Sequence, residues 1–383
     1  MTLKIYIVAA EPSGDALGAD LIDALRKQDC DIEFAGIGGP AMARRGVPSL
    51  FNIDSLSVIG LIEGLRAYKT VKKHVEIAAE DIMKSKPDVV VLIDSWGFMW
   101  RVGQRMKELG SDALRVKLVG PQVWATRAGR AKILAQHVDH LLCIHQFETP
   151  FYEPYDLPTT VIGNPAVSRT DLGDKADFKQ RHGITGKEVI GLLPGSRLSE
   201  MRRVLPVLEA AASKLCDNRP DRVVVCFAAD AVSDTLRKSS SEWTFPHLLV
   251  SGDTEKADAF SAMDVALTCS GTVTTEVALQ GTPIVVGYKI GWITWAIARA
   301  FLMKSPYLTL LNVAAGRPVA PEFIQTKLTP DRVSAAAEKI LSNTSKRKAQ
   351  IAAQFEALDT MGRGGRAATD IAAETILKLA SSQ

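Results

Sequence analysis

The sequence predicts two successive α/β domains, each built around a parallel β-sheet. Short apolar runs rich in β-branched residues alternate with longer helical patterns up to residue 167, and the alternation starts again after it. Continuous apolar strands separated by helices are typical of parallel sheets that are covered on both faces. The length supports this division, because a chain of 383 residues exceeds the size at which a single hydrophobic core stops growing.

The expected elements follow the chain in order. In the first domain we expect strands at 5–9, 32–36, 89–93, 116–119, 140–144 and 160–162, with helices over 16–26 and 69–84. A polar stretch after residue 167 indicates a linker and a short helix. In the second domain we expect strands at 189–193, 223–227, 248–251, 265–268 and 284–286. From Thr329 onward the pattern is helical to the end, with a glycine-rich break at 361–366.

Composition narrows the class of protein. The 46 basic residues barely outnumber the 43 acidic ones, and this net charge of +3 argues against nucleic-acid binding driven by bulk charge. Five scattered cysteines without a CxxC pair fit a reducing cytoplasm better than a disulfide framework or a zinc site. No window of about 18 residues is apolar and uncharged, and the chain opens directly on a strand. We therefore expect neither a membrane-spanning helix nor a signal peptide.

Polar residues follow the first strand, at the edge where open parallel sheets bind ligands. This turn carries Glu11, Ser13, Gly14 and Asp15. Gly14 permits a tight turn, and Ser13 or Asp15 is expected to cap a helix that begins near Ala16. Free backbone N–H groups at that helix start suit an anion, although an ordinary capped turn explains the pattern equally well.

Two further strands of the first domain end in polar residues. Asp94 closes the apolar strand PDVVVLID, so its carboxylate is expected at the ligand edge rather than in the core. Partial burial there would favour a general base, and a helix N-cap is the alternative. Gln122, Trp124 and Arg127 follow the next strand. Arg127 adds charge that suits a phosphorylated ligand, whereas Trp124 is expected either to stack on a ligand or to pack at the sheet edge.

Two glycine turns with hydroxyl groups follow strands of the second domain. The first holds Gly195, Ser196 and Arg197, and the second holds Ser270, Gly271 and Thr272, with Glu276 one turn further on. Helix N-termini after such turns offer free N–H groups to phosphates, and a glutamate can accept both hydroxyls of a ribose. Because the P-loop pattern and GxGxxG are missing, we do not expect ATP hydrolysis or a dinucleotide. A capped helix with a surface glutamate is the alternative, but two such turns in one domain favour a nucleotide diphosphate.

An ordered set of motifs along nearly the whole chain resembles the lipid A disaccharide synthases, a family of inverting glycosyltransferases with the GT-B fold. The matching stretches are AAEPSGD (9–15), VIGLIE (58–63), PDVVVLID (87–94), PQVWATR (121–127), VIGNP (161–165), LLPGSRLSE (192–200), CSGTVTTE (269–276), PIVVGYK (283–289) and LLNVAAGR (310–317). LLPGSR or SGT alone is a weak signal, because related glycosyltransferases use similar loops, but the ordered set is specific. The chain departs from the family pattern at three places: Ala10 for a glycine, Asn164 for a common histidine, and SWGFMWR (95–101) for APDFN, of which the last concerns the acceptor.

The resemblance implies a reaction and a division of labour. UDP-2,3-diacylglucosamine and 2,3-diacylglucosamine 1-phosphate would condense to a β-1′,6-linked lipid A disaccharide 1-phosphate and UDP, with no metal or other cofactor. An acceptor domain (1–167) and a UDP-sugar donor domain (168–340) would face a cleft, and C-terminal helices (341–383) would pack back on the first domain. Two arrangements of the C-terminal segments are possible: they pack within a monomer, or two copies of the chain exchange them in a homodimer.

The resemblance also assigns roles to residues. Asp94 would be the general base for the acceptor 6-hydroxyl. The substrate-binding set would be Glu11, Ser13, Gly14, Asp15, Gln122, Trp124 and Arg127. The UDP-binding set would be Gly195, Ser196, Arg197, Ser270, Gly271, Thr272, Glu276 and Asn312.

Lipid substrates imply a cytoplasmic protein bound peripherally to the inner face of the inner membrane. The expected membrane-contact set combines apolar with basic residues: Val58, Ile59, Leu61, Ile62, Leu65, Arg66, Lys69, Lys72 and Lys73. The run 292–303 is a second candidate, and core packing is the alternative for both. The competing functions are another UDP-sugar GT-B enzyme (an N-acetylglucosamine transferase or an epimerase) and a non-catalytic nucleotide-sugar or lipid-binding protein.

Overall fold

The computed structural model describes residues 2–29, 31–53, 61–124, 127–168, 172–228, 232–252, 254–271, 273–292, 295 and 305–382. The chain divides into two compact units. Unit 1 comprises Met1–Pro165 and Gly365–Gln383, and unit 2 comprises Ala166–Gly364.

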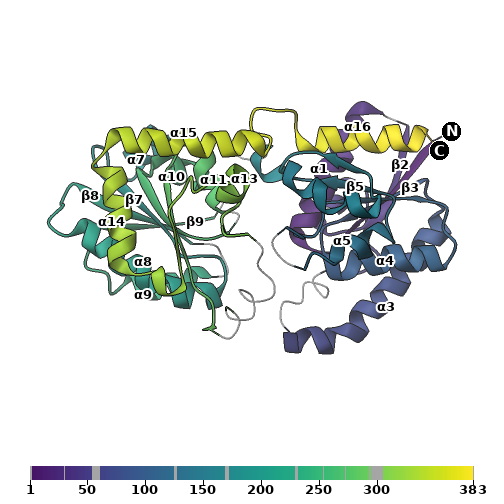
Figure 1. Cartoon of the computed structure of the whole chain (residues 1–383), viewed down its shortest axis with the longest axis horizontal. Coiled ribbons are helices and arrows are strands. Elements are labelled where there is room, and N and C mark those ends of the chain that lie inside the picture. Colours follow the sequence, from purple (N-terminus) through teal and green to yellow (C-terminus); the bar gives the residue numbers. More distant parts are fainter. Residues whose placement is uncertain are drawn as a thin grey trace. The chain divides into compact units, whose positions relative to one another are not determined.

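Unit 1 contains one sheet of six parallel strands in the order β2-β1-β3-β4-β5-β6 (Figure 1). Its strands are β1 (Leu3–Ala9), β2 (Ile32–Ile37), β3 (Val89–Ile93), β4 (Leu114–Leu118), β5 (His140–Cys143) and β6 (Thr159–Val161). Its helices are α1 (Pro12–Gln28), α2 (Pro40–Ala43), α3 (Leu61–Ser85), α4 (Trp96–Glu108), α5 (Arg130–Ala135), α16 (Ala368–Ser381) and the 3₁₀ turns η2 (Gln146–Phe151) and η3 (Glu153–Tyr155). The six strands expected from the sequence are therefore present.

Helices cover both faces of this sheet, as the unbroken apolar strands require. Along β1 the side chains alternate: Tyr6 and Val8 pack with α3, α4 and α5, whereas Ile5 and Ile7 pack with α1 and α16. Figure 1 shows these two layers on opposite sides of the strands. The central strands of the sheet are thus buried inside unit 1, whereas the edge strands β2 and β6 are partly exposed.

Unit 2 repeats the plan with the strand order β12-β11-β10-β7-β8-β9. Its strands, all parallel, are β7 (Glu188–Leu193), β8 (Arg222–Ala228), β9 (His247–Ser251), β10 (Val265–Cys269), β11 (Ile284–Tyr288) and β12 (Glu322–Ile324). Its helices are α7 (Lys175–Arg181), α8 (Leu198–Cys216), α9 (Ser233–Ser240), α10 (Lys256–Ala262), α11 (Val273–Leu279), α13 (Leu310–Ala315), α14 (Pro330–Leu341), α15 (Thr344–Thr360) and the turn η6 (Gln325–Lys327), with α6 (Pro165–Ser168) at the junction. The sequence did not predict β12, because three residues are too few to show a strand pattern.

The last two helices belong to different units. Ala372 and Ile376 of α16 are buried in the core of unit 1 beside α1. In contrast, Ala357 and Leu358 of α15 are buried in the core of unit 2. We expected the whole segment 341–383 to return to the first domain, and that boundary is wrong, because the returning segment begins at Gly365.

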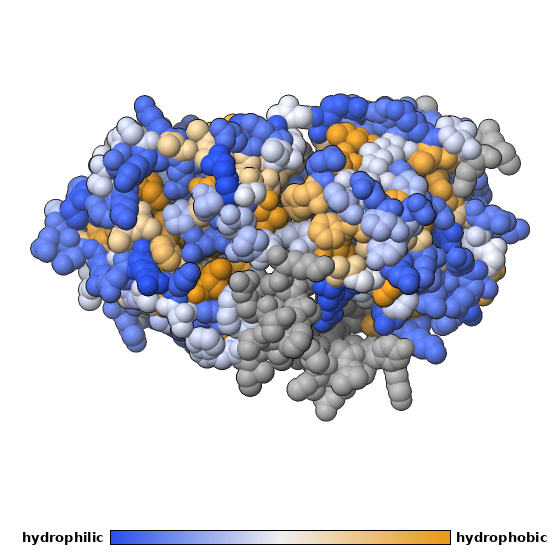
Figure 2. Space-filling view, viewed as in Figure 1, coloured by the Kyte–Doolittle hydropathy of each residue, from blue (hydrophilic) through white to orange (hydrophobic). Residues whose placement is uncertain are grey.

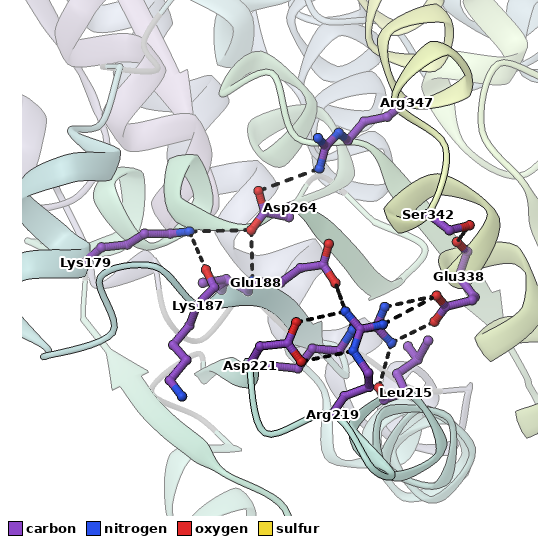
Figure 3. A network of polar contacts seen from close by, with 12 residues as sticks. Lys179, Lys187, Glu188, Leu215, Arg219, Asp221, Asp264, Glu338, Ser342 and Arg347 are labelled. Carbon is purple, nitrogen blue, oxygen red and sulfur yellow. Dashed lines mark hydrogen bonds and ion pairs between the residues drawn. The ribbon is translucent and has the colours of Figure 1, made fainter.

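Charged side chains close the amino ends of the strands in unit 2 (Figure 3). Arg222, the first residue of β8, is only 2% exposed and donates to Glu188 at 2.8 Å and to Glu338 at 2.7 Å. Asp264, which precedes β10, forms an ion pair with Lys179 at 3.5 Å. These contacts occupy the amino edge of the sheet, so the carboxyl edge is the edge left for a ligand.

The viewed surface is mostly hydrophilic, with hydrophobic residues in small separate patches (Figure 2). Within the described ranges, no helix combines the length and the apolar character needed to cross a membrane. Most of the expected membrane-contact set lies outside the described residues or at positions whose side chains are not described. The exceptions are Lys72 and Lys73, which are exposed on α3. Of the run 292–303, only Trp292, which is 61% exposed, and Trp295 are described.

Candidate active site

The strand order of unit 1 places its first two polar turns side by side. The chain runs from β1 through α1 to β2 on one side, and from the neighbouring strand β3 through α4 to β4 on the other side. The connections therefore leave β1 and β3 in opposite directions, and such a switch point forms a crevice in open α/β sheets. Ala9 pairs with Ile93 across β1 and β3. The residues that follow, Glu11 and Asp94, therefore extend from adjacent strands at this point. The structure thus brings together two residues that are far apart in the sequence.

Asp94 is held in an uncommon backbone conformation. Its φ is 44° and that of Ser95 is 35°, which is the left-handed region that non-glycine residues rarely occupy. The Asp94 N–H donates to Leu118 O at 2.9 Å, and α4 begins only at Trp96, with Ser95 as its N-cap residue. Asp94 is exposed, so the expected partial burial is wrong, and so is the N-cap alternative. The result is a carboxylate presented to solvent from a fixed backbone.

The turn after β1 differs from the expectation in one important way. Helix α1 begins at Pro12 rather than near Ala16, and neither Ser13 nor Asp15 caps it. Ser13 is exposed, whereas Gly14 and Asp15 are buried. The Asp15 carboxylate instead accepts hydrogen bonds from three backbone N–H groups at the start of α2: Gly39 at 2.7 Å, Ala41 at 2.8 Å and Met42 at 3.0 Å. Asp15 therefore fixes the β2–α2 loop beside the candidate site.

The loop after β4 supplies aromatic and basic side chains. Gln122 and Arg127 are exposed, and Trp124 is half-buried with its ring edge-on to Phe147 at a centroid distance of 5.3 Å. The Arg130 guanidinium lies 5.1 Å from the centre of the Trp96 ring, which directly follows the Asp94 turn. Burial, and then the charge of Arg127, lower the pKa of Arg130. These contacts place positively charged and aromatic side chains next to the Asp94 turn.

Two buried ionisable residues follow β5: Glu148, which sequence reasoning missed, and His145, for which a surface or helix-end position was expected. His145 directly precedes η2, but it is buried, so the expected surface position is wrong. His145 stacks on Phe147 at 4.8 Å, and burial lowers the pKa of His145 to about 4. Burial raises the pKa of Glu148 to about 8. Their position directly after a buried strand was the signal that could have found them.

In unit 2, both predicted glycine turns lie at the switch point of the second sheet. Strands β7 and β10 are neighbours, and Leu193 pairs with Thr268. The turn after β7 contains Gly195, whose φ is 109°, and Arg197 is the N-cap residue of α8. A Cβ atom on Gly195 would lie 3.4 Å from the Cβ of Cys269, so the first turn lies against the end of β10, directly before the second turn. The structure therefore brings these two predicted turns together.

The polar groups of these turns differ in their exposure and in their hydrogen-bond and ion-pair partners. Ser196, like Arg197, is exposed, and Arg197 donates to Glu200 at 2.8 Å. Ser270 and Gly271 directly follow β10, and Thr272 lies outside the described residues. Glu276 forms an ion pair with Lys256 of α10 at 2.5 Å. An exposed arginine beside a helix N-terminus and two strand-end turns can hold a diphosphate.

Asn312 has a structural role that the sequence did not reveal. It is buried in α13, its amide donates to Ala320 O and Glu322, and its carbonyl accepts from the N–H groups of Val319 and Ala320, all at 2.8–2.9 Å. Both amide donors are in use, so Asn312 holds the loop before β12 rather than offering a free donor. Asn312 also lines a pocket of about 450 Å³ together with Trp292 and Tyr307.

Comparison with known protein families gives a consistent result over the whole chain. The family model described as lipid-A-disaccharide synthetase matches residues 5–376. The lipid-A-disaccharide synthase of Rhodospirillum centenum is 39% identical over 380 residues, which cover 98% of this chain and 94% of the relative. That of Paramagnetospirillum magneticum is 37% identical over 98% of this chain and 97% of the relative.

Solved structures show similarity in fold alone. UDP-GlcNAc 2-epimerase from Neisseria meningitidis, bound to UDP-GlcNAc, has a TM-score of 0.64 at 12% identity, covering 98% of this chain and 100% of that chain. MurG of Acinetobacter baumannii has a TM-score of 0.59 at 16% identity, covering 98% of this chain and 99% of that chain. These neighbours are GT-B enzymes, and the two six-stranded parallel sheets found here agree with that fold.

Proposed function

This chain belongs to the lipid-A-disaccharide synthase family of glycosyltransferases, and we propose that Asp94 is the general base of its reaction. In the proposed step, the 6-hydroxyl oxygen of 2,3-diacylglucosamine 1-phosphate attacks the anomeric carbon of UDP-2,3-diacylglucosamine. The hydroxyl proton passes to the Asp94 carboxylate, and the bond between the anomeric carbon and the diphosphate breaks. A single displacement of this kind inverts the anomeric carbon and gives a β-linkage.

The observation that carries this proposal is the placement of Asp94. It is an exposed carboxylate at the switch point of a parallel sheet, next to the Glu11 turn, on a backbone fixed by a hydrogen bond to β4. A base must reach the substrate, and an exposed strand-end carboxylate can do so. The neighbouring Arg127 and Arg130 would receive the 1-phosphate of the acceptor, because guanidinium groups bind phosphate in a bidentate manner.

The donor would bind at the β7 and β10 turns of unit 2. Arg197, the N-terminus of α8 and the Ser270–Gly271 turn are the groups we expect to stabilise the charge that develops on the leaving diphosphate. Glu276 would accept the ribose hydroxyls. We propose that these groups make a divalent metal unnecessary, and turnover unchanged by excess EDTA is the expected result.

The test uses purified full-length protein with both lipid substrates and measures UDP release. Asp94→Asn keeps the shape and tolerates the left-handed backbone, so we expect a loss of turnover of at least a hundredfold with nearly unchanged UDP affinity. Asp156→Asn is the matched control, because Asp156 is also exposed with a φ of 53° but precedes β6 rather than following a strand. Full turnover by Asp94→Asn would refute the assignment, and a large loss of UDP affinity would move Asp94 to the donor site.

We place the membrane contact at the start of α3. The apolar residues at 58–65 precede Lys72 and Lys73, which are exposed on this helix, and apolar segments with basic neighbours bind anionic interfaces. In vesicle flotation with anionic lipids, the double change Leu61→Ser and Ile62→Ser should reduce binding severalfold. Unchanged flotation would exclude this surface.

A further inference from the structure

Lys117 is a buried lysine in the middle of the unit 1 sheet. It lies in β4 and is 1% exposed, between the apolar residues Val116 and Leu118. Its Nζ lies within hydrogen-bond distance of three backbone carbonyl oxygens: Leu92 at 3.2 Å, Asp94 at 2.5 Å and Leu118 at 3.4 Å. A protonated lysine has three N–H donors and no acceptor, so the number of carbonyl acceptors matches the ammonium form.

The backbone that this ammonium binds is the strained turn at the candidate site. Asp94 and Ser95 have φ values of 44° and 35°, and Val119, which follows Lys117 closely, has a φ of 66°. A β-branched residue such as valine is especially unfavourable in this region. Strained residues keep such conformations only when their surroundings hold them there. The Asp94 N–H is held by Leu118 O and the Asp94 carbonyl by Lys117, so both sides of this residue are tied to β4.

Packing alone does not account for a lysine at this position. Burial lowers the pKa of Lys117 to about 7, because the charged form loses its hydration. Two carboxylates, those of Asp94 and Glu11, act in the opposite direction and favour the ammonium. An apolar side chain would fill the same space without this desolvation penalty. The lysine therefore adds something specific, namely three donors directed at the carboxyl ends of β3 and β4.

We propose that Lys117 is a positioning residue for Asp94, holding the backbone of the β3–α4 turn so that the carboxylate points at the acceptor hydroxyl. The inference rests on the proposed role of Asp94 as general base. Loss of the Lys117 donors would free the Asp94 carbonyl, and the carboxylate would sample directions away from the hydroxyl. Because an error of about 1 Å in a reacting group can lower the rate about a hundredfold, the effect should appear in kcat.

The experiment compares two variants with a matched control in the full-length protein. Lys117→Met keeps the length and loses all donors, whereas Lys117→Gln keeps two amide donors. Val116→Ala is the control, since Val116 lies on the same strand but faces the opposite side of the sheet. The measurements are kcat and KM with UDP-2,3-diacylglucosamine and 2,3-diacylglucosamine 1-phosphate, UDP affinity by calorimetry, and the urea midpoint.

For Lys117→Met we expect kcat to fall 10- to 100-fold with KM for the donor and UDP affinity within about twofold of wild type. Lys117→Gln should recover part of kcat, and it also serves if the Met variant does not fold. Val116→Ala should lower the urea midpoint and leave kcat unchanged. The inference would be overturned if both Lys117→Gln and Lys117→Met kept the wild-type kcat. It would also be overturned if Val116→Ala, at equal stability, showed the same fall in kcat as the Lys117 variants. Full turnover by Asp94→Asn would instead overturn the proposed function, so the two failures are distinguishable.

Discussion

Replacing Asp15 tests whether this residue supports the fold or contacts the substrate. Its carboxylate is 3% exposed and accepts three backbone hydrogen bonds of 2.7–3.0 Å from the β2–α2 loop. A hydrogen bond to a charged group contributes about 1.5–3 kcal/mol, and buried N–H groups left without an acceptor add to the loss. In Asp15→Asn the amide nitrogen must face at least one backbone N–H, so we expect the free energy of unfolding to fall by about 2 kcal/mol. Asp15→Ala leaves all three N–H groups unpaired, and we expect about 4 kcal/mol.

Urea unfolding gives the free energy of unfolding, and UDP affinity reports on unit 2, where we propose that the donor binds. Both Asp15 variants should lower the urea midpoint and leave UDP affinity unchanged, because the three hydrogen bonds of this carboxylate lie within unit 1. Ser13→Ala is the control, since Ser13 is exposed on the same turn of α1 and should not change the midpoint. An Asp15→Asn protein with wild-type stability but no turnover would refute this reasoning and make Asp15 a substrate contact.

Three further predictions concern other parts of the molecule. Gly195→Ala places a Cβ on a residue with a φ of 109°, and calorimetry should show UDP affinity reduced about tenfold. Arg222→Met removes the buried partner of Glu188 and Glu338 and leaves Arg219 at 3.5 Å and 4.0 Å from them, so urea unfolding should show a loss of about 2 kcal/mol in the free energy of unfolding, with UDP affinity retained. Burial raises the pKa of Glu148 from 4.5 to about 8, so the stability it contributes is fully present below pH 4.5 and is lost as the pH rises towards 8. Because glutamine does not ionise, the Glu148→Gln protein should lose about 4 kcal/mol less free energy of unfolding than wild type between pH 5 and pH 8. The same pH dependence of stability in wild type and Glu148→Gln would contradict the prediction.

Local patterns in the sequence were sufficient for the sheets and for the turns at their carboxyl edges. A parallel strand buried on both faces is a short apolar run, so eleven of the twelve described strands could be placed before the structure was known. Ligand-binding turns follow strands in such sheets, and this rule, together with the glycine and hydroxyl residues of the turns, selected those at Gly195 and Ser270 as well as the turn at Asp94. The short β12 gave no pattern, and the membership of α15 in unit 2 depends on which core its apolar face fills.

Partnerships between distant residues were decided only by the tertiary structure. The family resemblance assigned Asp15 and Asn312 to ligand binding, but Asp15 binds a loop 24 or more residues away, and the amide of Asn312 is bonded to the loop before β12. Lys117 looked like an ordinary strand residue until three carbonyl groups met around its ammonium. The sequence by itself determined which residues reach the edges of the two sheets, because strand periodicity is local. Only the folded chain decided which of those side chains remain free for a substrate, because hydrogen-bond partners are chosen by proximity in space.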